Sequence, residues 1–176
     1  MKKYKTIIMS ALLLITISLF SAYLNKTSIN NNDYQKVNNN IESGAYTIVK
    51  SQPNPDFKIE YGASITHYYR KDNIVAEDYL ILNSFSERKY RVYYTTNNNV
   101  YYIKGTIQVF SKDKFSKDGN EDTGFKDYTD NEEYTVANGK IITYFLNGID
   151  LSSKASKEND LIEDLAGLKA KNIIVK

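Results

Sequence analysis

The longest apolar run of the chain lies at its beginning. Residues 7–24, IIMSALLLITISLFSAYL, carry no charge over eighteen positions and follow three lysines. This length approaches the roughly 20 residues that cross a bilayer and exceeds the roughly 7–15 apolar residues of a signal-peptide core. Phe20 or Leu19 would stand third before a cleavage site, where a small residue is needed. The pattern favours a retained anchor over residues 1–24, with a cleaved signal peptide as the alternative.

The lysines before this run predict its orientation in the membrane. A short Lys-rich end stays in the cytoplasm, so residues 25–176 are expected on the outer side. Residues 25–32, NKTSINNN, read as a polar tether, and a folded extracytoplasmic domain is expected over residues 33–176. The chain contains no cysteine, which excludes both a disulfide framework and a lipid-modified cysteine.

Two segments have the spacing of amphipathic helices. In residues 33–43 three apolar residues recur at helical spacing, and Gly44 follows as a helix-ending residue. A second helix is expected near the end of the chain, with Ser156 as its N-cap and acidic residues in its first turn. The apolar positions of the two helices are Tyr34, Val37, Ile41, Leu161, Ile162, Leu165 and Leu168.

Between the helices the apolar residues alternate with polar ones, as in half-buried strands. Strands are predicted near residues 45–50, 57–61, 63–71, 76–83, 88–96, 100–110, 133–137 and 140–147. Asn138-Gly139 is the strongest hairpin signal, because a two-residue type I′ turn needs positive φ angles. The ending NIIVK reads as a closing strand or a packed tail. The order predicts an α+β fold: an antiparallel β-meander sheet with a short N-terminal helix and a C-terminal amphipathic helix.

The hairpin of residues 88–110 predicts how two neighbouring strands divide their side chains. The apolar residues of the two strands share a face only if the numbers of paired residues sum to an odd number. A two-residue turn at Asn97-Asn98 or Asn98-Asn99 gives such a register, and Asn tolerates the φ angles that it requires. One face then carries Tyr90, Val92, Tyr94, Tyr101, Ile103, Gly105, Ile107 and Val109. The other face carries the candidate partner-binding residues Arg91, Tyr93, Tyr102 and Lys104. Tyr and Arg are enriched at protein interfaces, although cross-strand pairs on a solvated sheet explain the same residues structurally.

The charge of the chain argues against nucleic acid as a partner. The net charge is +2, with 23 basic and 21 acidic residues. Three of the basic residues lie in the leader, which leaves the exported part with 20 basic residues against 21 acidic ones. A nucleic-acid-binding domain would instead need a basic face.

An acidic segment, residues 113–133, separates two of the predicted strands. It contains eight acidic residues and three lysines. Asp118, Asn120 and Asp122 have the first spacing of a calcium loop, but Thr123 stands where the turn glycine belongs. The motif is therefore incomplete, and no metal is expected. A solvated loop between two strands explains the segment. Alternatively, an acidic protrusion around Asp118, Glu121 and Asp122 would meet a basic partner surface and speed association.

The chain lacks the common signatures of catalysis. His67 is the only histidine, and there is no nucleophile elbow, no cysteine, no phosphate loop and no multi-histidine metal site. The numbers of serine, histidine and aspartate residues do not exclude a Ser-His-Asp triad, but a single histidine on a strand is usually structural. The acidic segment gives no reason to expect a carboxylate with a raised pKa. A non-catalytic protein without a cofactor is expected.

The layout resembles the TipC-type immunity proteins of Gram-positive bacteria. The resemblance rests on MKKYKTIIMSALLLITISLF, on the Tyr-rich strands YRVYYTT and VYYIKGTIQVF, and on the short helix near the end. It implies a single-pass, outward-facing membrane protein that binds an antibacterial toxin exported by type VII secretion. The implied complex is one-to-one, and the toxin would act on cell-wall lipid precursors outside the membrane.

A structural component of a conjugation or secretion machine is the second interpretation. Some such components join one N-terminal span to an α+β domain, but they usually have a longer cytoplasmic tail than the six residues found here. Pseudopilins would continue the apolar run into a long helix, and NKTSINNN interrupts it. An enzyme or small-ligand-binding protein is a third, less favoured interpretation.

Overall fold

The computed structural model describes residues 31–95, 100–111, 126–169 and 173–174. The chain forms two compact units, Met1–Gln35 and Lys36–Lys176, and the sheet belongs to the second unit. The predicted anchor and the first six residues of the predicted tether lie outside the described residues. Within the described ranges, no helix has the length and apolar character needed to cross a membrane.

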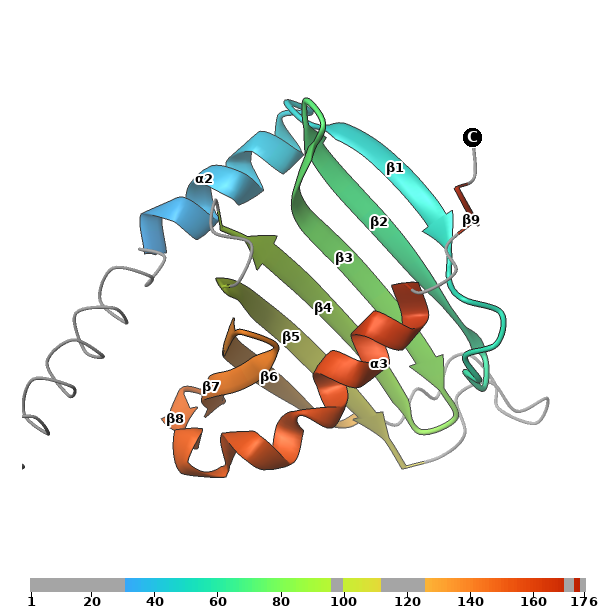
Figure 1. Ribbon diagram of the computed structural model, residues 1–176. Helices are drawn as coiled ribbons and strands as arrows, with labels where there is room; N and C mark the ends of the chain where they lie inside the picture. Colours follow the sequence, from blue (N-terminus) through green and yellow to red (C-terminus); the bar gives the residue numbers. More distant parts are fainter. Residues whose placement is uncertain (1–30, 96–99, 112–125, 170–172, 175–176) are drawn as a thin grey trace, which may run out of the picture. The chain divides into compact units, whose positions relative to one another are not determined.

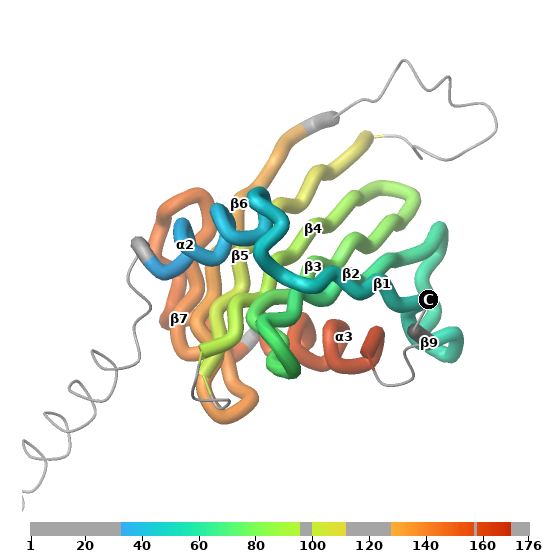
Figure 2. The backbone as a smooth tube through the Cα atoms, turned by 90° about the horizontal axis from the view of Figure 1, so that it is seen from above, coloured from blue at the N-terminus to red at the C-terminus, as the bar shows by residue number. Residues whose placement is uncertain are grey.

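The second unit is built on a nine-stranded antiparallel sheet (Figures 1 and 2). Strands β1 to β8 follow one another across the sheet in chain order, and β9 pairs with the free side of β1. The fold is therefore α+β with an antiparallel meander, as predicted. The elements are α2 (Asn31–Glu42), β1 (Thr47–Gln52), β2 (Gly62–Arg70), β3 (Asn73–Asn83), β4 (Ser86–Tyr94), β5 (Val100–Phe110), β6 (Lys126–Ala137), β7 (Lys140–Leu146), β8 (Ile149–Asp150), the 3₁₀ helix η2 (Ser152–Glu158), α3 (Asp160–Lys169) and β9 (Ile173–Ile174).

Two turn signals in the sequence, Gly44 and Asn138-Gly139, are confirmed, whereas the predicted Asn turn at residues 97–99 lies outside the described residues. Gly44, at φ 71°, follows the end of α2, and the Ala45 N–H donates to the Asn40 carbonyl at 2.8 Å. This bond satisfies one of the backbone carbonyls that have no hydrogen-bond donor within the helix at its C-terminal end. Asn138 and Gly139 have φ angles of 51° and 73° between β6 and β7, where Ala137 pairs with Lys140.

The predicted strand 57–61 is wrong, and the structure explains why. The connection between β1 and β2 contains Pro53 and Pro55, which have no N–H to give to a sheet. Asn54 instead binds the end of α3: its N–H donates to the Leu168 carbonyl at 2.9 Å and its Nδ2 to the Gly167 carbonyl at 3.2 Å. We call residues 53–61 the strap, because they fasten the end of β1 to the end of α3.

The starts of β6 and of the C-terminal helix also differ from the prediction. Strand β6 begins at Lys126 rather than near residue 133, and these additional residues pair with β5 as far as Phe110. Ser156 does not cap α3, because it lies inside η2. The first turn of α3 is closed by the Asn159 carbonyl, which accepts the Ile162 N–H at 3.0 Å.

The two faces of the sheet have different environments. On the inner face, η2 and α3 cover the core, and Leu161, Leu165 and Leu168 are buried as predicted. The hairpin register matches the predicted parity, with Tyr90 opposite Gly105 and Val92 opposite Ile103. The buried core residues of the sheet include Ile65, Tyr79, Ile81, Tyr90, Val92, Ile103, Tyr134, Val136, Ile141 and Tyr144. The opposite side, which we call the outer face, carries the polar residues of the same strands.

Gly105 is required in β5 because the ring of Tyr90 lies directly over it. A Cβ atom at Gly105 would lie 2.3 Å from Cδ1 of Tyr90. Gly105→Ala is therefore expected to destabilise the domain by about 1–3 kcal/mol through overpacking, measured by urea unfolding. Thr106→Ala, one position along on the outer face, is the control and should stay within about 0.5 kcal/mol of the wild type. Equal stabilities of the two variants would contradict this packing.

Candidate functional site

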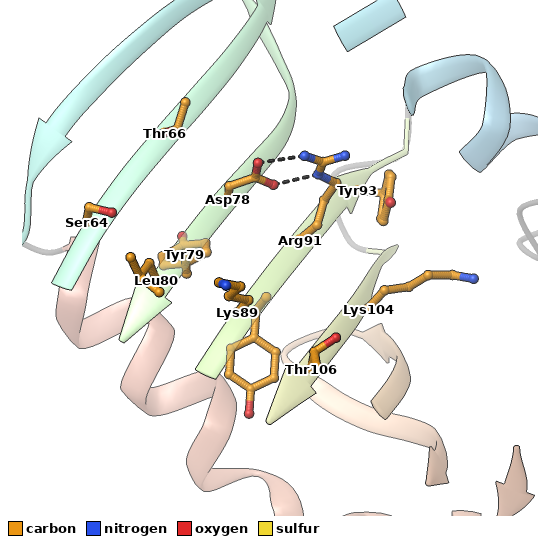
Figure 3. Close-up of a pocket in the computed structure, with 11 residues that line it drawn as sticks. Ser64, Thr66, Asp78, Tyr79, Leu80, Lys89, Arg91, Tyr93, Lys104 and Thr106 are labelled. Carbon is orange, nitrogen blue, oxygen red and sulfur yellow. Dashed lines mark hydrogen bonds and ion pairs between the residues drawn. The ribbon is translucent and has the colours of Figure 1, made fainter. Parts of the chain in front are cut away.

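A row of charged side chains crosses the outer face from strand to strand. In the sheet register Asp78 of β3 is opposite Arg91 of β4, Arg91 is opposite Lys104 of β5, and Lys104 is opposite Glu133 of β6. We call these four residues the charge row. Figure 3 shows Asp78, Arg91 and Lys104 along a shallow cavity of about 370 Å³. Two of the predicted binding residues, Arg91 and Lys104, are thus brought side by side.

Arg91 is the most strongly held member of the charge row. Its Nε and Nη2 donate to the two oxygens of Asp78 at 2.5 and 2.7 Å, and its Nη1 donates to Asn38 Oδ1 in α2 at 2.8 Å. Such a bidentate pair fixes the plane of the guanidinium. The bonds to Asp78 raise the pKa of Arg91 above its usual value. Arg91 therefore stays charged, and its guanidinium is held in one orientation.

Tyr68 supports the same pair from β2. Its hydroxyl donates to Asp78 Oδ2 at 2.8 Å, and the Arg91 guanidinium lies 5.6 Å from the centre of its ring. Burial, followed by the bond to Asp78, raises the pKa of Tyr68. This arrangement combines a hydrogen bond with a cation–π contact, so Arg91 rests against an aromatic ring as well as a carboxylate.

Lys104 is held more loosely than Arg91. Its Nζ lies 3.4 Å from Glu133 Oε1, and its side chain is 35% exposed. Lys89, farther along β4, pairs with Glu87 at 2.6 Å. The six charged residues of this part of the outer face thus balance as three acids and three bases: Asp78, Glu87, Glu133, Lys89, Arg91 and Lys104. The surface is neutral in sum but has cations at its centre.

The two tyrosines of the predicted site lie on the outer face but are covered. Tyr93 and Tyr102 pair across β4 and β5 and are only 4% and 6% exposed. The Tyr93 hydroxyl donates to Asn38 Oδ1 at 3.1 Å, the same oxygen that accepts from Arg91. The expected exposed aromatic surface is therefore smaller than the alternation suggested, because α2 meets this end of the face at Asn38. Asp118, Glu121 and Asp122 lie outside the described residues.

A second polar cluster lies on the inner face around Glu77, which is fully buried. Its Oε1 accepts from His67 Nδ1 at 2.7 Å, and its Oε2 accepts from Tyr79 at 3.0 Å, from Lys169 Nζ at 2.8 Å and from the Tyr94 hydroxyl. His67 Nε2 in turn lies 2.7 Å from Ser51 Oγ. The members of this Glu77 network are Ser51, His67, Glu77, Tyr79, Tyr94 and Lys169.

The donors in the Glu77 network decide the charge of its carboxyl. Burial alone would raise the pKa of Glu77, but the bonds from His67, Lys169 and Tyr94 outweigh it and lower the pKa to about 2. Burial and the nearby carboxylate raise the pKa of Tyr79 and Tyr94. Glu77 is therefore ionised at neutral pH, while the two tyrosines keep their protons and act as donors.

A third cluster surrounds Glu132 on the inner face of β6. The Tyr90 hydroxyl donates to Oε2 at 3.1 Å and the Tyr144 hydroxyl to Oε1 at 3.5 Å, while the Tyr134 and Tyr144 rings stack at 4.8 Å. Here burial prevails and raises the pKa of Glu132. Burial, followed by Glu132, also raises the pKa of Tyr144, to about 12. No lysine or arginine bonds to Glu132 in the described part of the chain, which distinguishes it from Glu77.

Sequence reasoning missed both inner clusters, although a signal was present. Glu77 alternates with Tyr79, and Glu132 with Tyr134, so each acid shares a strand face with an aromatic residue. A carboxylate in phase with core residues is buried and needs donors, which tyrosine hydroxyls supply.

Comparisons of this chain with protein-family models, with curated proteins and with solved structures found no match.

Proposed function

We propose that this protein is a membrane-tethered immunity protein that binds and neutralises an exported antibacterial toxin. The observation that carries the proposal is the centre of the charge row, where the two cationic residues Arg91 and Lys104 occupy paired positions of β4 and β5. Like charges in this position repel and cost stability. Asp78 and Glu133 offset part of that repulsion, and a partner carboxylate bound beside the two cations would offset more of it.

The surroundings of the charge row suit recognition by a protein. The row lies on four neighbouring strands of one sheet, which holds its side chains at fixed spacing. Arg91 is fixed by Asp78 and Asn38, so it loses little conformational freedom on binding. The acidic flanks, Asp78 and Glu133, restrict which charge patterns fit. These features support a specific protein partner with an acidic group at its centre and basic groups beside it.

The proposed anchor supplies the second part of the function. A tether of a few residues would keep the domain within a short distance of the outer leaflet and raise its effective concentration there. A toxin that acts on lipid precursors would meet the blocker where the chemistry takes place.

A competition assay tests the proposal. Cells lacking the gene are expected to be killed by toxin-secreting siblings, and residues 1–176 supplied in trans should restore survival. A version restricted to residues 25–176 and kept in the cytoplasm is the control and should not protect. If deletion leaves survival unchanged but blocks export or conjugation, the protein is a machine component and the immunity proposal fails.

A further inference from the structure

The inner face contains a chain of three polar side chains that the binding function does not use. Ser51, His67 and Glu77 stand on β1, β2 and β3, and all three are buried. The register places His67 directly opposite Glu77, with Ser51 two pairs farther along opposite Ile65. Ser51 Oγ is 2.7 Å from His67 Nε2, and His67 Nδ1 is 2.7 Å from Glu77 Oε1.

The order of donors and acceptors along this chain follows from Glu77. An ionised carboxylate only accepts hydrogen bonds, so His67 Nδ1 must carry a proton and donate a hydrogen bond to Glu77. In a neutral imidazole the lone pair then lies on Nε2, facing Ser51 Oγ, and the serine hydroxyl donates to it. Tyr79 and Lys169 hold the other carboxylate oxygen at 3.0 and 2.8 Å, which fixes the carboxylate behind the histidine.

We propose that Ser51 is an activated nucleophile that takes the acyl group of a small carboxylic ester, with His67 as its general base and Glu77 as a positioning residue. A nucleophile bonded to a base that is oriented by a carboxylate is the arrangement by which serine becomes reactive. This arrangement is recognised by its geometry and not by the order of its residues in the sequence, so no sequence motif predicted it. The site lies on the inner face and does not depend on the charge row.

The proposed reaction needs only Ser51, His67, an ester and water. Ser51 Oγ attacks the carbonyl carbon while its proton moves to His67 Nε2. The carbon–oxygen bond of the leaving group then breaks, and the alcohol departs with the proton from His67. Water attacks the acyl-serine by the same route in reverse, with His67 again accepting and returning the proton, and releases the acid.

We expect access to Ser51 to depend on the strap. Ser51 is only 4% exposed, and the strap begins two residues after it. The strap is fastened to α3 by the two Asn54 bonds, at 2.9 and 3.2 Å, and Phe57 packs against Gly167. Release of Asn54 would separate the end of β1 from the end of α3. Small reagents are therefore expected to reach Ser51 during such openings.

A fluorophosphonate probe tests this site on the full chain. Attack by Ser51 forms a phosphorus–oxygen bond, expels fluoride and leaves the serine proton with His67. Mass spectrometry is expected to find the probe on Ser51 and not on Ser64, an exposed serine on β2. His67→Gln should slow labelling by about 100-fold or more, and Asn54→Ala should speed it several-fold by loosening the strap.

Circular dichroism keeps the test independent of folding, because each variant must retain the β-rich spectrum of the wild type to be counted. Unlabelled Ser51 in folded wild-type protein would overturn the proposal, and so would equal labelling of Ser51 and Ser64. Undiminished labelling in folded His67→Gln would also overturn it. An Asn54→Ala variant that reacts no faster than the wild type would refute control of access by the strap.

Discussion

Replacing Glu77 with Gln is expected to destabilise the folded domain by about 3 kcal/mol at pH 7. The pKa of Glu77 is lowered to about 2 in the folded protein, against an ordinary value near 4.3, and each pKa unit is worth about 1.4 kcal/mol. The amide cannot compensate Lys169 or His67, so two donors lose a charged acceptor. Urea unfolding followed by circular dichroism measures the loss.

The pH dependence of this loss has a defined sign. Because the folded-state pKa of Glu77 lies below the unfolded one, the unfolded state binds the proton more readily in acid. The stabilisation is complete above about pH 5 and disappears as the pH falls towards 2. The difference in the free energy of unfolding between the wild type and Glu77→Gln should therefore become smaller over that pH range. A difference that stays constant down to pH 2 would show that the charge of Glu77 is not what stabilises the fold.

Glu132→Gln is the matched control, since it alters another buried glutamate among tyrosines. Burial raises the pKa of Glu132, so its ionised form becomes a cost to the fold as the pH rises through that value. An amide oxygen still accepts from the Tyr90 hydroxyl and carries no charge. The variant is expected to be as stable as the wild type at pH 7, or more stable. Equal destabilisation by the two substitutions would contradict the different environments of the two acids.

Exchanging the charges of Lys104 and Glu133 is expected to weaken recognition of the partner strongly without unfolding the domain. The double variant Lys104→Glu, Glu133→Lys keeps an ion pair between β5 and β6 but moves the cation away from Arg91. A partner carboxylate would then face a glutamate, and we expect affinity to fall by roughly tenfold to a hundredfold. Calorimetric titration with the captured partner measures this loss.

The position of Lys104 makes this exchange more informative than reversing Arg91. Arg91 bonds to Asp78 and Asn38, so Arg91→Glu would disturb the contact with α2 as well as the surface. Lys89→Ala is the control, because Lys89 is 61% exposed and pairs with Glu87 outside the charge row. Full affinity in the exchanged variant would exclude the charge row from the interface, whereas equal loss in Lys89→Ala would indicate a diffuse electrostatic effect.

Local patterns in the sequence predicted those parts of the fold that depend on local rules. Strand alternation placed Arg91 and Lys104 on one face, and the odd-sum register of β4 and β5 followed from turn chemistry. Asn138-Gly139 predicted its hairpin because few other residues accept two positive φ angles. The leucine stripe of α3 was visible because a helix must bury one face.

The remainder depends on contacts between distant parts of the chain. That His67 meets Glu77 follows from the register between β2 and β3, which alternation alone does not determine. The strap lost its predicted strand because Asn54 binds α3, more than 110 positions away. Tyr93 looked exposed by parity, yet the outer face meets α2 at Asn38. Tyr79, Tyr68 and Tyr90 donate to the carboxylates of Glu77, Asp78 and Glu132, and alternation alone did not predict these contacts.

Affinity capture from the producing cells tests the central claim most directly. Tagged residues 25–176 and the Lys104–Glu133 exchanged variant would be used side by side as baits, with mass spectrometry of the bound proteins. We expect the wild-type bait to hold one exported toxin in a one-to-one complex, and the exchanged bait to lose it. Capture of secretion-machine components instead, or equal capture of the toxin by both baits, would contradict the proposed function or its binding face respectively.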